Sequence, residues 1–192
     1  MRYGNPSIEK QLLKLLDKNC EFILIFPLFP QYSATTSASI FDEVAKIMSK
    51  RRNIPHISFL KQFHDHDSYI EAIVSHLKEF WEKNKRSEKL ILSYHGIPNK
   101  YFKKGDIYHC FCQKTSRLIK EKLNLKDNEI LTTFQSRLGP SEWLTPYTDE
   151  TIISLANNNL ENMDIFSPGF ASDCLETIEE LGIENKENFL KN

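Results

Sequence analysis

The chain has 192 residues, of which 40% are hydrophobic and 27% are charged, as is typical of soluble globular proteins. Its 25 basic and 26 acidic side chains give a formal net charge of -1, which argues against a nucleic-acid-binding protein that relies on bulk positive charge. No apolar run approaches the roughly 20 residues of a membrane-spanning helix, and residues 1–10 lack the apolar core of a secretory signal. Four cysteines are too few for a disulfide scaffold, so the sequence favours a cytoplasmic protein with free thiols.

Short apolar runs alternate with amphipathic segments along the whole chain. The continuous apolar run at residues 22–29 is typical of a strand buried on both faces. Helices are predicted at about 8–16, 40–48, 67–84, 108–123, 149–157 and 173–190, and strands at 22–29, 57–60, 89–95, 130–136 and 164–168. Strands that alternate with helices of this length indicate right-handed crossovers and a parallel sheet covered on both sides.

The alternation predicts an α/β protein with parallel-sheet, Rossmann-like lobes. The most polar stretch, residues 83–89, is the best candidate for a boundary, so we place one lobe at residues 1–85 and a second at residues 86–192. An α/β unit normally begins with a strand, whereas this chain opens and closes with a helix. We therefore expect the first lobe to be incomplete and the chain to be the middle and later part of a longer protein.

Polar residues gather directly after the predicted strands, and in an open parallel sheet ligands bind outside the carboxyl ends of the strands. His95 ends one strand, and Gly96 and Pro98 break the chain directly behind it, which presents the imidazole at a turn. A histidine that only caps the next element is the alternative. Aromatic residues that would suit a flat apolar ligand, although each alone is more often core, are Phe29, Tyr32, Tyr94, Phe134, Trp143 and Phe170.

Three carboxylates, Asp173, Glu176 and Glu180, are spaced to share one stripe of the last predicted helix. The opposite side, expected to face the core, carries Leu175, Ile178 and Leu181. A carboxylate stripe that starts beside a strand end could hold a cation or move protons. Two alternatives stay open: a capping box, with Asp173 as N-cap and Glu176 reaching back, and a solvated acidic face.

Other metal-binding and catalytic motifs are weak or absent. Cys110 and Cys112 beside His109 resemble part of a metal site, but a closed tetrahedral site needs four ligands. His64 and His66 are interpreted as a polar loop before a helix. The sequence has no Gly-rich phosphate loop, nucleophile elbow or His-Glu-x-x-His motif, which weakens assignments to nucleotide enzymes, serine hydrolases and zinc proteases.

Four of the strand-end segments together resemble the ferrochelatase family, especially its Gram-negative bacterial members. They are residues 93–98 (SYHGIP), 133–137 (TFQSR), 142–150 (EWLTPYTDE) and 168–177 (PGFASDCLET). Residues 1–6 (MRYGNP) and 28–33 (LFPQYS) resemble the family as well. The resemblance covers essentially the whole chain in the right order.

This resemblance implies chelatase-type lobes around a porphyrin cleft and the insertion of Fe²⁺ into protoporphyrin IX to form protohaem. It implies that His95 binds the metal or accepts a pyrrole proton, and that Glu176 is the carboxylate partner across the cleft. Asp173 and Glu180 would form a proton or metal path. The implied porphyrin-binding residues are Arg2, Tyr3, Tyr32, Ser136, Trp143 and Phe170. These residue types suit the chemistry, because a neutral imidazole accepts a proton near neutral pH and carboxylates collect protons that are released.

The resemblance also implies the partners, which are protoporphyrin IX and Fe²⁺, with no resident cofactor. An iron–sulfur cluster is not expected, because Cys110 and Cys112 lack the further ligands that clustered relatives carry near the C-terminus. No nucleic acid and no transmembrane segment are expected, while peripheral membrane contact and the oligomeric state stay open. The chain is shorter than family members at both ends, and Cys174 stands where some relatives carry histidine. Alternatives are a non-catalytic porphyrin- or metal-binding fragment and a chelatase for another tetrapyrrole or metal.

Overall fold

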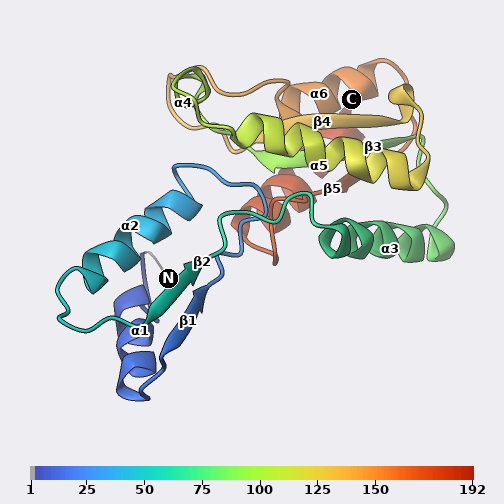
Figure 1. The fold of residues 1–192 in the computed structure, drawn as a ribbon. Coiled ribbons are helices and arrows are strands. Elements are labelled where there is room, and N and C mark those ends of the chain that lie inside the picture. Colours follow the sequence, from blue (N-terminus) through green and yellow to red (C-terminus); the bar gives the residue numbers. More distant parts are fainter. Residues whose placement is uncertain (1–2) are drawn as a thin grey trace. The chain divides into compact units, whose positions relative to one another are not determined.

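Two separate parallel sheets organise the computed structural model, which describes residues 3–192 (Figure 1). The sheets belong to two compact units, which divide between Phe63 and His64. The first sheet has two strands, and the second has three. The predicted α/β fold with parallel sheets is therefore confirmed in both units.

The first unit consists of two helices and two strands: α1 (Ile8–Asp17), β1 (Phe22–Ile25), α2 (Ser37–Met48) and β2 (His56–Phe59). Strands β1 and β2 pair in parallel. The Ser7 side chain caps α1 by accepting a hydrogen bond from the Lys10 amide at 3.1 Å. The apolar faces of α1 and α2 meet the sheet in a small buried cluster of Leu12, Ile23, Val44, Ile47 and Met48.

The prediction that the strand within residues 22–29 is buried on both faces is wrong. Successive side chains of a strand point to opposite faces, and in β1 only one of these faces reaches the helices. Ile23 is buried there, whereas Phe22 and Leu24 are 61% and 56% exposed. The strand also ends at Ile25, well before the apolar run does. The continuous apolar pattern therefore predicts more burial of this strand than the described residues provide.

The second unit is built on a sheet of order β4-β3-β5, all parallel. Its helices and strands are α3 (Asp67–Lys83), β3 (Lys89–His95), α4 (Asn99–Lys103), α5 (Tyr108–Leu123), the 3₁₀ turn η1 (Asp127–Glu129), β4 (Ile130–Gln135), α6 (Thr148–Asn157), β5 (Met163–Phe166), the π-helix η2 (Glu176–Asn185) and α7 (Lys186–Lys191). The three predicted strands of this unit are confirmed. The short helix α4 was not predicted, because five residues show no helical periodicity.

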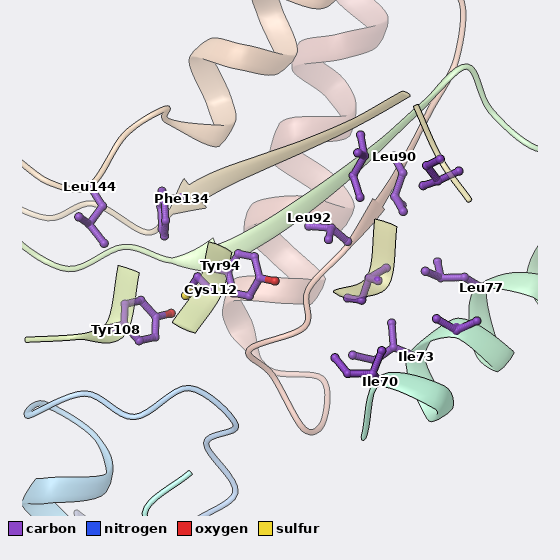
Figure 2. Packing of buried hydrophobic residues seen from close by; sticks show 14 of the residues in the cluster. Ile70, Ile73, Leu77, Leu90, Leu92, Tyr94, Tyr108, Cys112, Phe134 and Leu144 are labelled. Carbon is purple, nitrogen blue, oxygen red and sulfur yellow. The ribbon is translucent and has the colours of Figure 1, made fainter. Parts of the chain in front are cut away.

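The apolar core of the second unit lies on one face of its central strand (Figure 2). Leu90, Leu92 and Tyr94 alternate along β3 and pack against residues of α3 and α5. Helix α3 contributes Ile70, Ile73, Val74 and Leu77, and α5 contributes Tyr108, Cys112 and Ile119. The interior of β3 is fully buried, as its continuous apolar run predicts.

Helix α3 packs on the sheet of the second unit. The division of contacts between residues 63 and 64 therefore differs from the lobe boundary predicted after residue 85. The polar stretch at 83–89 is a solvated connection between α3 and β3 within one unit. It is tied to that unit by the Arg86–Glu129 ion pair and by a hydrogen bond of 2.7 Å from the Ser87 hydroxyl to Asp164.

The last predicted helix is mainly a π-helix, which changes the side chains it buries. Leu175 and Ile178, which were predicted to face the core, are 73% and 57% exposed, and only Leu181 is buried. The i→i+5 bonds of a π-helix widen each turn, so the i, i+3 spacing of an α-helix no longer marks one face. The buried Asn185 side chain spans the same five-residue separation, because its amide donates to the Glu180 carbonyl at 2.8 Å.

The core around β3 predicts the cost of a single truncation. Leu92→Ala removes a fully buried side chain and is expected to lower the free energy of unfolding by about 2–5 kcal/mol. Leu138→Ala, at an exposed position of the same unit, is the matched control and is expected to change it by less than about 0.5 kcal/mol. Urea denaturation of both variants measures the difference. Equal losses would contradict the placement of β3.

Candidate active site

The imidazole of His95 lies at the carboxyl end of β3 and is half-buried. Its Nδ1 is 2.7 Å from the Gly96 carbonyl oxygen, and the Tyr108 hydroxyl donates to the His95 carbonyl at 2.9 Å. A carbonyl oxygen only accepts hydrogen bonds, so the neutral ring carries its proton on Nδ1. This tautomer leaves the lone pair on Nε2, which is the form of histidine that binds a metal or accepts a proton.

Gly96 allows the chain to turn sharply behind this imidazole. A Cβ at this position would lie 3.0 Å from the Gln135 carbonyl oxygen and 3.1 Å from the Trp143 ring. The Gly96 amide also donates to the same carbonyl at 2.8 Å. The close approach of β4 to the turn therefore favours glycine here, because a larger residue would force the Gln135 backbone or the Trp143 ring to shift by a few tenths of an ångström.

Glu176 begins η2 and is half-buried. A hydrogen bond from the Cys174 side chain holds the pKa of the Glu176 carboxyl below its usual value, with smaller contributions from a backbone hydrogen bond and from the charge of His95. Burial, followed by the interaction with Glu176, raises the pKa of the Cys174 thiol. At neutral pH the site thus contains a neutral thiol, an ionised carboxylate and an imidazole within electrostatic reach of it.

Glu180, one turn further along η2, is bound at the end of β4. Its carboxylate accepts hydrogen bonds from the Ser136 amide at 2.7 Å, the Ser136 hydroxyl at 2.5 Å and the Gln135 side-chain amide at 3.3 Å. Ser136 has a φ of 61°, in the left-handed region that non-glycine residues rarely adopt. The bend at Ser136 directs its amide and its hydroxyl to the same carboxylate.

Two aromatic rings flank His95. The ring centroids of Trp143 and Phe170 lie 6.4 and 6.5 Å from that of the imidazole, with interplanar angles of 47° and 41°. The Trp143 indole N–H donates to the Leu138 carbonyl at 3.1 Å, which holds the ring in place. The second unit therefore brings together His95, Trp143 and Phe170 from three segments that are distant in the sequence.

Asp173 does not form the capping box that was one interpretation of its spacing to Glu176. It is exposed and accepts a hydrogen bond from the Thr177 hydroxyl at 3.0 Å, while that hydroxyl accepts one from the Cys174 amide at 3.0 Å. Asp173 and Phe170 line an open groove of about 480 Å³ beside β5, α3 and η2. The three carboxylates therefore have different surroundings. Asp173 lines the groove, Glu176 lies within electrostatic reach of the imidazole, and Glu180 is bound at the end of β4.

Two of the predicted porphyrin-binding residues, Tyr3 and Tyr32, belong to the first unit. Tyr3 is exposed, and Tyr32 is half-buried with the Lys61 ammonium 4.7 Å from its ring centroid. Arg2 lies outside the described residues. The roles of these three residues stay predictions.

The other candidate metal ligands do not converge. Cys110 is exposed on α5, whereas Cys112 is fully buried in the core, where burial raises the pKa of its thiol. His66 caps α3 by accepting from the Ser68 amide at 3.3 Å, and His64 is buried and stacked on Phe111 at 3.9 Å. Within residues 3–192 no group of three or more His, Cys, Asp or Glu side chains is arranged to hold a metal ion. The pair His95 and Glu176 can thus supply two ligands, fewer than the four of a closed structural site.

Gln135 is the residue of this site that the sequence reasoning missed. It is almost fully buried, and its amide contacts both the backbone of Glu176 and the side chain of Glu180. The available signal was a long polar side chain at the end of an otherwise apolar strand. That pattern shows that the side chain needs partners, but it does not show which ones.

Comparison with known proteins places this chain in a family. The chain matches the family description "Ferrochelatase" over residues 1–192. Ferrochelatases of Marinobacter nauticus and Idiomarina loihiensis are 51% and 49% identical to it over 191 residues, which are 100% of this chain and 52% of each relative. The chain therefore spans about half the length of the curated relatives it matches.

A solved structure supports the fold independently. SirB from Bacillus subtilis with Fe3+ superposes with a TM-score of 0.66 over 96% of this chain and 68% of that chain, at 17% sequence identity. At this identity the likeness concerns the fold alone. Among residues 3–192, no helix is long and apolar enough to cross a membrane.

The contact between Cys174 and Glu176 predicts a change in titration. Cys174→Ala removes the main group that stabilises the ionised carboxylate, so the pKa of Glu176 is expected to rise. Because the pKa of this carboxyl is lowered by folding, its ionisation stabilises the native state at neutral pH, and this stabilisation is lost as the pH falls through the folded-state pKa. Carbon-13 NMR of the glutamate carboxyls measures the shift. Cys110→Ala is the control, and an unshifted Glu176 in Cys174→Ala would refute this account.

Proposed function

Because this chain belongs to the ferrochelatase family, we propose that it carries out the insertion of Fe²⁺ into protoporphyrin IX to form protohaem. The observation that supports the proposal most strongly is that the His95 imidazole and a carboxylate with a lowered pKa, Glu176, lie within electrostatic reach of each other where β3 ends and η2 begins. Fe²⁺ and the porphyrin are both substrates in this reaction. The proposal requires no resident cofactor.

The reaction exchanges two protons for one divalent cation. Protoporphyrin IX loses the protons of two pyrrole N–H groups as Fe²⁺ enters, so the charge of the macrocycle core does not change. The Nε2 lone pair of His95 accepts a proton, and the ionised Glu176 nearby stabilises the imidazolium that results. Protons then leave towards solvent, and Asp173 and Glu180 are the residues predicted to form that path.

The same two groups suit the metal. Imidazole nitrogen and carboxylate oxygen are good ligands for Fe²⁺, and they also admit Zn²⁺ or Co²⁺. Trp143 and Phe170 offer apolar walls for the macrocycle beside the imidazole. Ser136 is a further proposed porphyrin contact, and Arg2, Tyr3 and Tyr32 stay predicted porphyrin-binding residues. We propose that the protein acts in the cytoplasm, with peripheral membrane contact left open.

An anaerobic assay with Fe²⁺ and protoporphyrin IX tests the proposal on the 192-residue chain. His95→Ala removes the proton acceptor, and its turnover is expected to fall by about 100-fold or more. His56→Ala, which removes an exposed imidazole from β2, is the matched control and is expected to retain full turnover.

Each other outcome has a defined meaning. Unchanged turnover in His95→Ala would sink the assignment of the site. A porphyrin absorbance shift without product would favour a non-catalytic porphyrin-binding protein. Insertion of Zn²⁺ or Co²⁺ without Fe²⁺ would favour a chelatase with another metal preference. Folded wild-type chain that gives neither product nor an absorbance shift would contradict the proposal for this chain.

A further inference from the structure

The side chain of Gln135 joins β3 and β4 to η2. Its carbonyl oxygen accepts from the Ser93 hydroxyl at 2.7 Å, and its amide nitrogen donates to the Glu176 carbonyl at 2.9 Å and to the Glu180 carboxylate at 3.3 Å. The Glu176 carbonyl can only accept a hydrogen bond, so the amide nitrogen must face η2 and the oxygen must face Ser93. The chemistry of its neighbours therefore sets the orientation of this amide.

The Ser93 hydroxyl that donates to the amide oxygen belongs to a chain of three buried hydroxyls. The Thr148 Oγ1 atom lies 2.9 Å from both the Ser93 Oγ and the Thr133 Oγ1, and all three residues are buried. Rotation of the Gln135 amide would leave the Ser93 hydroxyl facing an N–H group and would place the amide oxygen against a carboxylate. Such mismatches are costly in a buried network, so the amide is held in one orientation.

The position of Gln135 in the sheet relates these contacts to His95. The two residues are direct partners in the parallel register of β3 and β4. Register partners point to the same face of a sheet, so the amide that contacts η2 lies beside the strand end that carries the imidazole. One side chain therefore contacts the backbone of Glu176 and the carboxylate of Glu180 at the level of His95.

We propose that Gln135 is a positioning residue for metal insertion, holding Glu176 and Glu180 in place relative to His95. The inference rests on the proposed function, because it concerns the same site. Glu180 already accepts three hydrogen bonds, from Gln135 and Ser136, and so it anchors η2 to β4. Gln135 itself touches neither the metal nor the porphyrin in this assignment.

Two substitutions of Gln135 distinguish a role in positioning η2 from a role in packing alone. Gln135→Leu keeps the bulk and removes both N–H donors, and it is expected to lower kcat about tenfold while the KM for protoporphyrin IX changes less than about twofold. Gln135→Glu places a carboxylate against Glu180 at neutral pH. As the pH falls, one of the two carboxyls is protonated and can donate again, so the rate of this variant relative to wild type is expected to rise from pH 8 to pH 6.

Gln113→Glu is the matched control, since it introduces the same charge at an exposed position of α5. Its rate relative to wild type is expected to stay constant with pH. A pH-independent ratio for Gln135→Glu, or a loss in Gln135→Leu that is confined to KM, would overturn the inference.

A double-mutant cycle tests whether Gln135 acts through Glu180. If it does, Gln135→Leu combined with Glu180→Ala is expected to lose no more turnover than the more damaging single variant. Multiplicative losses would mean that the two residues act independently and would refute the anchoring role of Glu180.

Two measurements keep this inference distinct from the proposed function. Co²⁺ binding to the 192-residue chain and hydrogen exchange of the η2 amides need no turnover. In Gln135→Leu we expect about tenfold weaker Co²⁺ binding and faster exchange in η2. Both changes in a chain that does not insert metal would support positioning and reject the proposed function. Absence of Co²⁺ binding in the wild type, or unchanged binding and exchange in the variant, would reject positioning even in an active chain.

Discussion

The second unit depends on the burial of β3 between two parallel neighbours. The strand pairs with β4 on one side and with β5 on the other, and its interior residues are buried on both faces. A slip of one residue would send every side chain of β3 to the wrong face, so the register is strongly specified. The same constraint places His95, because the strand ends at a turn where Gly96 lies tightly against β4.

One face of this sheet is apolar, whereas the other carries a network of hydrogen-bonded polar side chains. On one face Leu90, Leu92 and Tyr94 pack against α3 and α5 in a dry core. On the other face Ser93 takes part in a network of hydroxyls and an amide that extends to η2. Alternation along β3 puts His95 on the face of Ser93, so the imidazole lies beside the polar network and away from the hydrophobic core. A buried polar layer that satisfies its own hydrogen bonds can therefore support the half-buried imidazole from behind.

Periodicity predicted the elements well where burial alone decides them, as in β3, β4 and α5. Periodicity failed where burial depends on contacts or on a helix type that the apolar pattern does not encode. The exposure of Phe22 and Leu24 depends on what covers the first sheet, and the apolar pattern of β1 carries no information on that. The i, i+3 spacing of the last helix assumed an α-helix, whereas residues 176–185 form a π-helix and both Leu175 and Ile178 are exposed. His95 and Glu176 were predicted as site residues because they follow strand ends. The orientation of Gln135 was not, because it depends on which atoms surround the amide.

The electrostatics of the His95–Glu176 pair suggest how the two groups divide the proposed reaction. A carboxyl whose pKa is lowered is a weak base, so Glu176 is poorly suited to take a pyrrole proton, whereas the Nε2 lone pair of His95 can do so. The charge of Glu176 instead favours metal approach and the imidazolium that follows. Two protein ligands are also fewer than the four nitrogens that the porphyrin offers. In the proposed reaction a metal held by this pair would therefore pass to the macrocycle, whereas a closed four-ligand protein site would retain it.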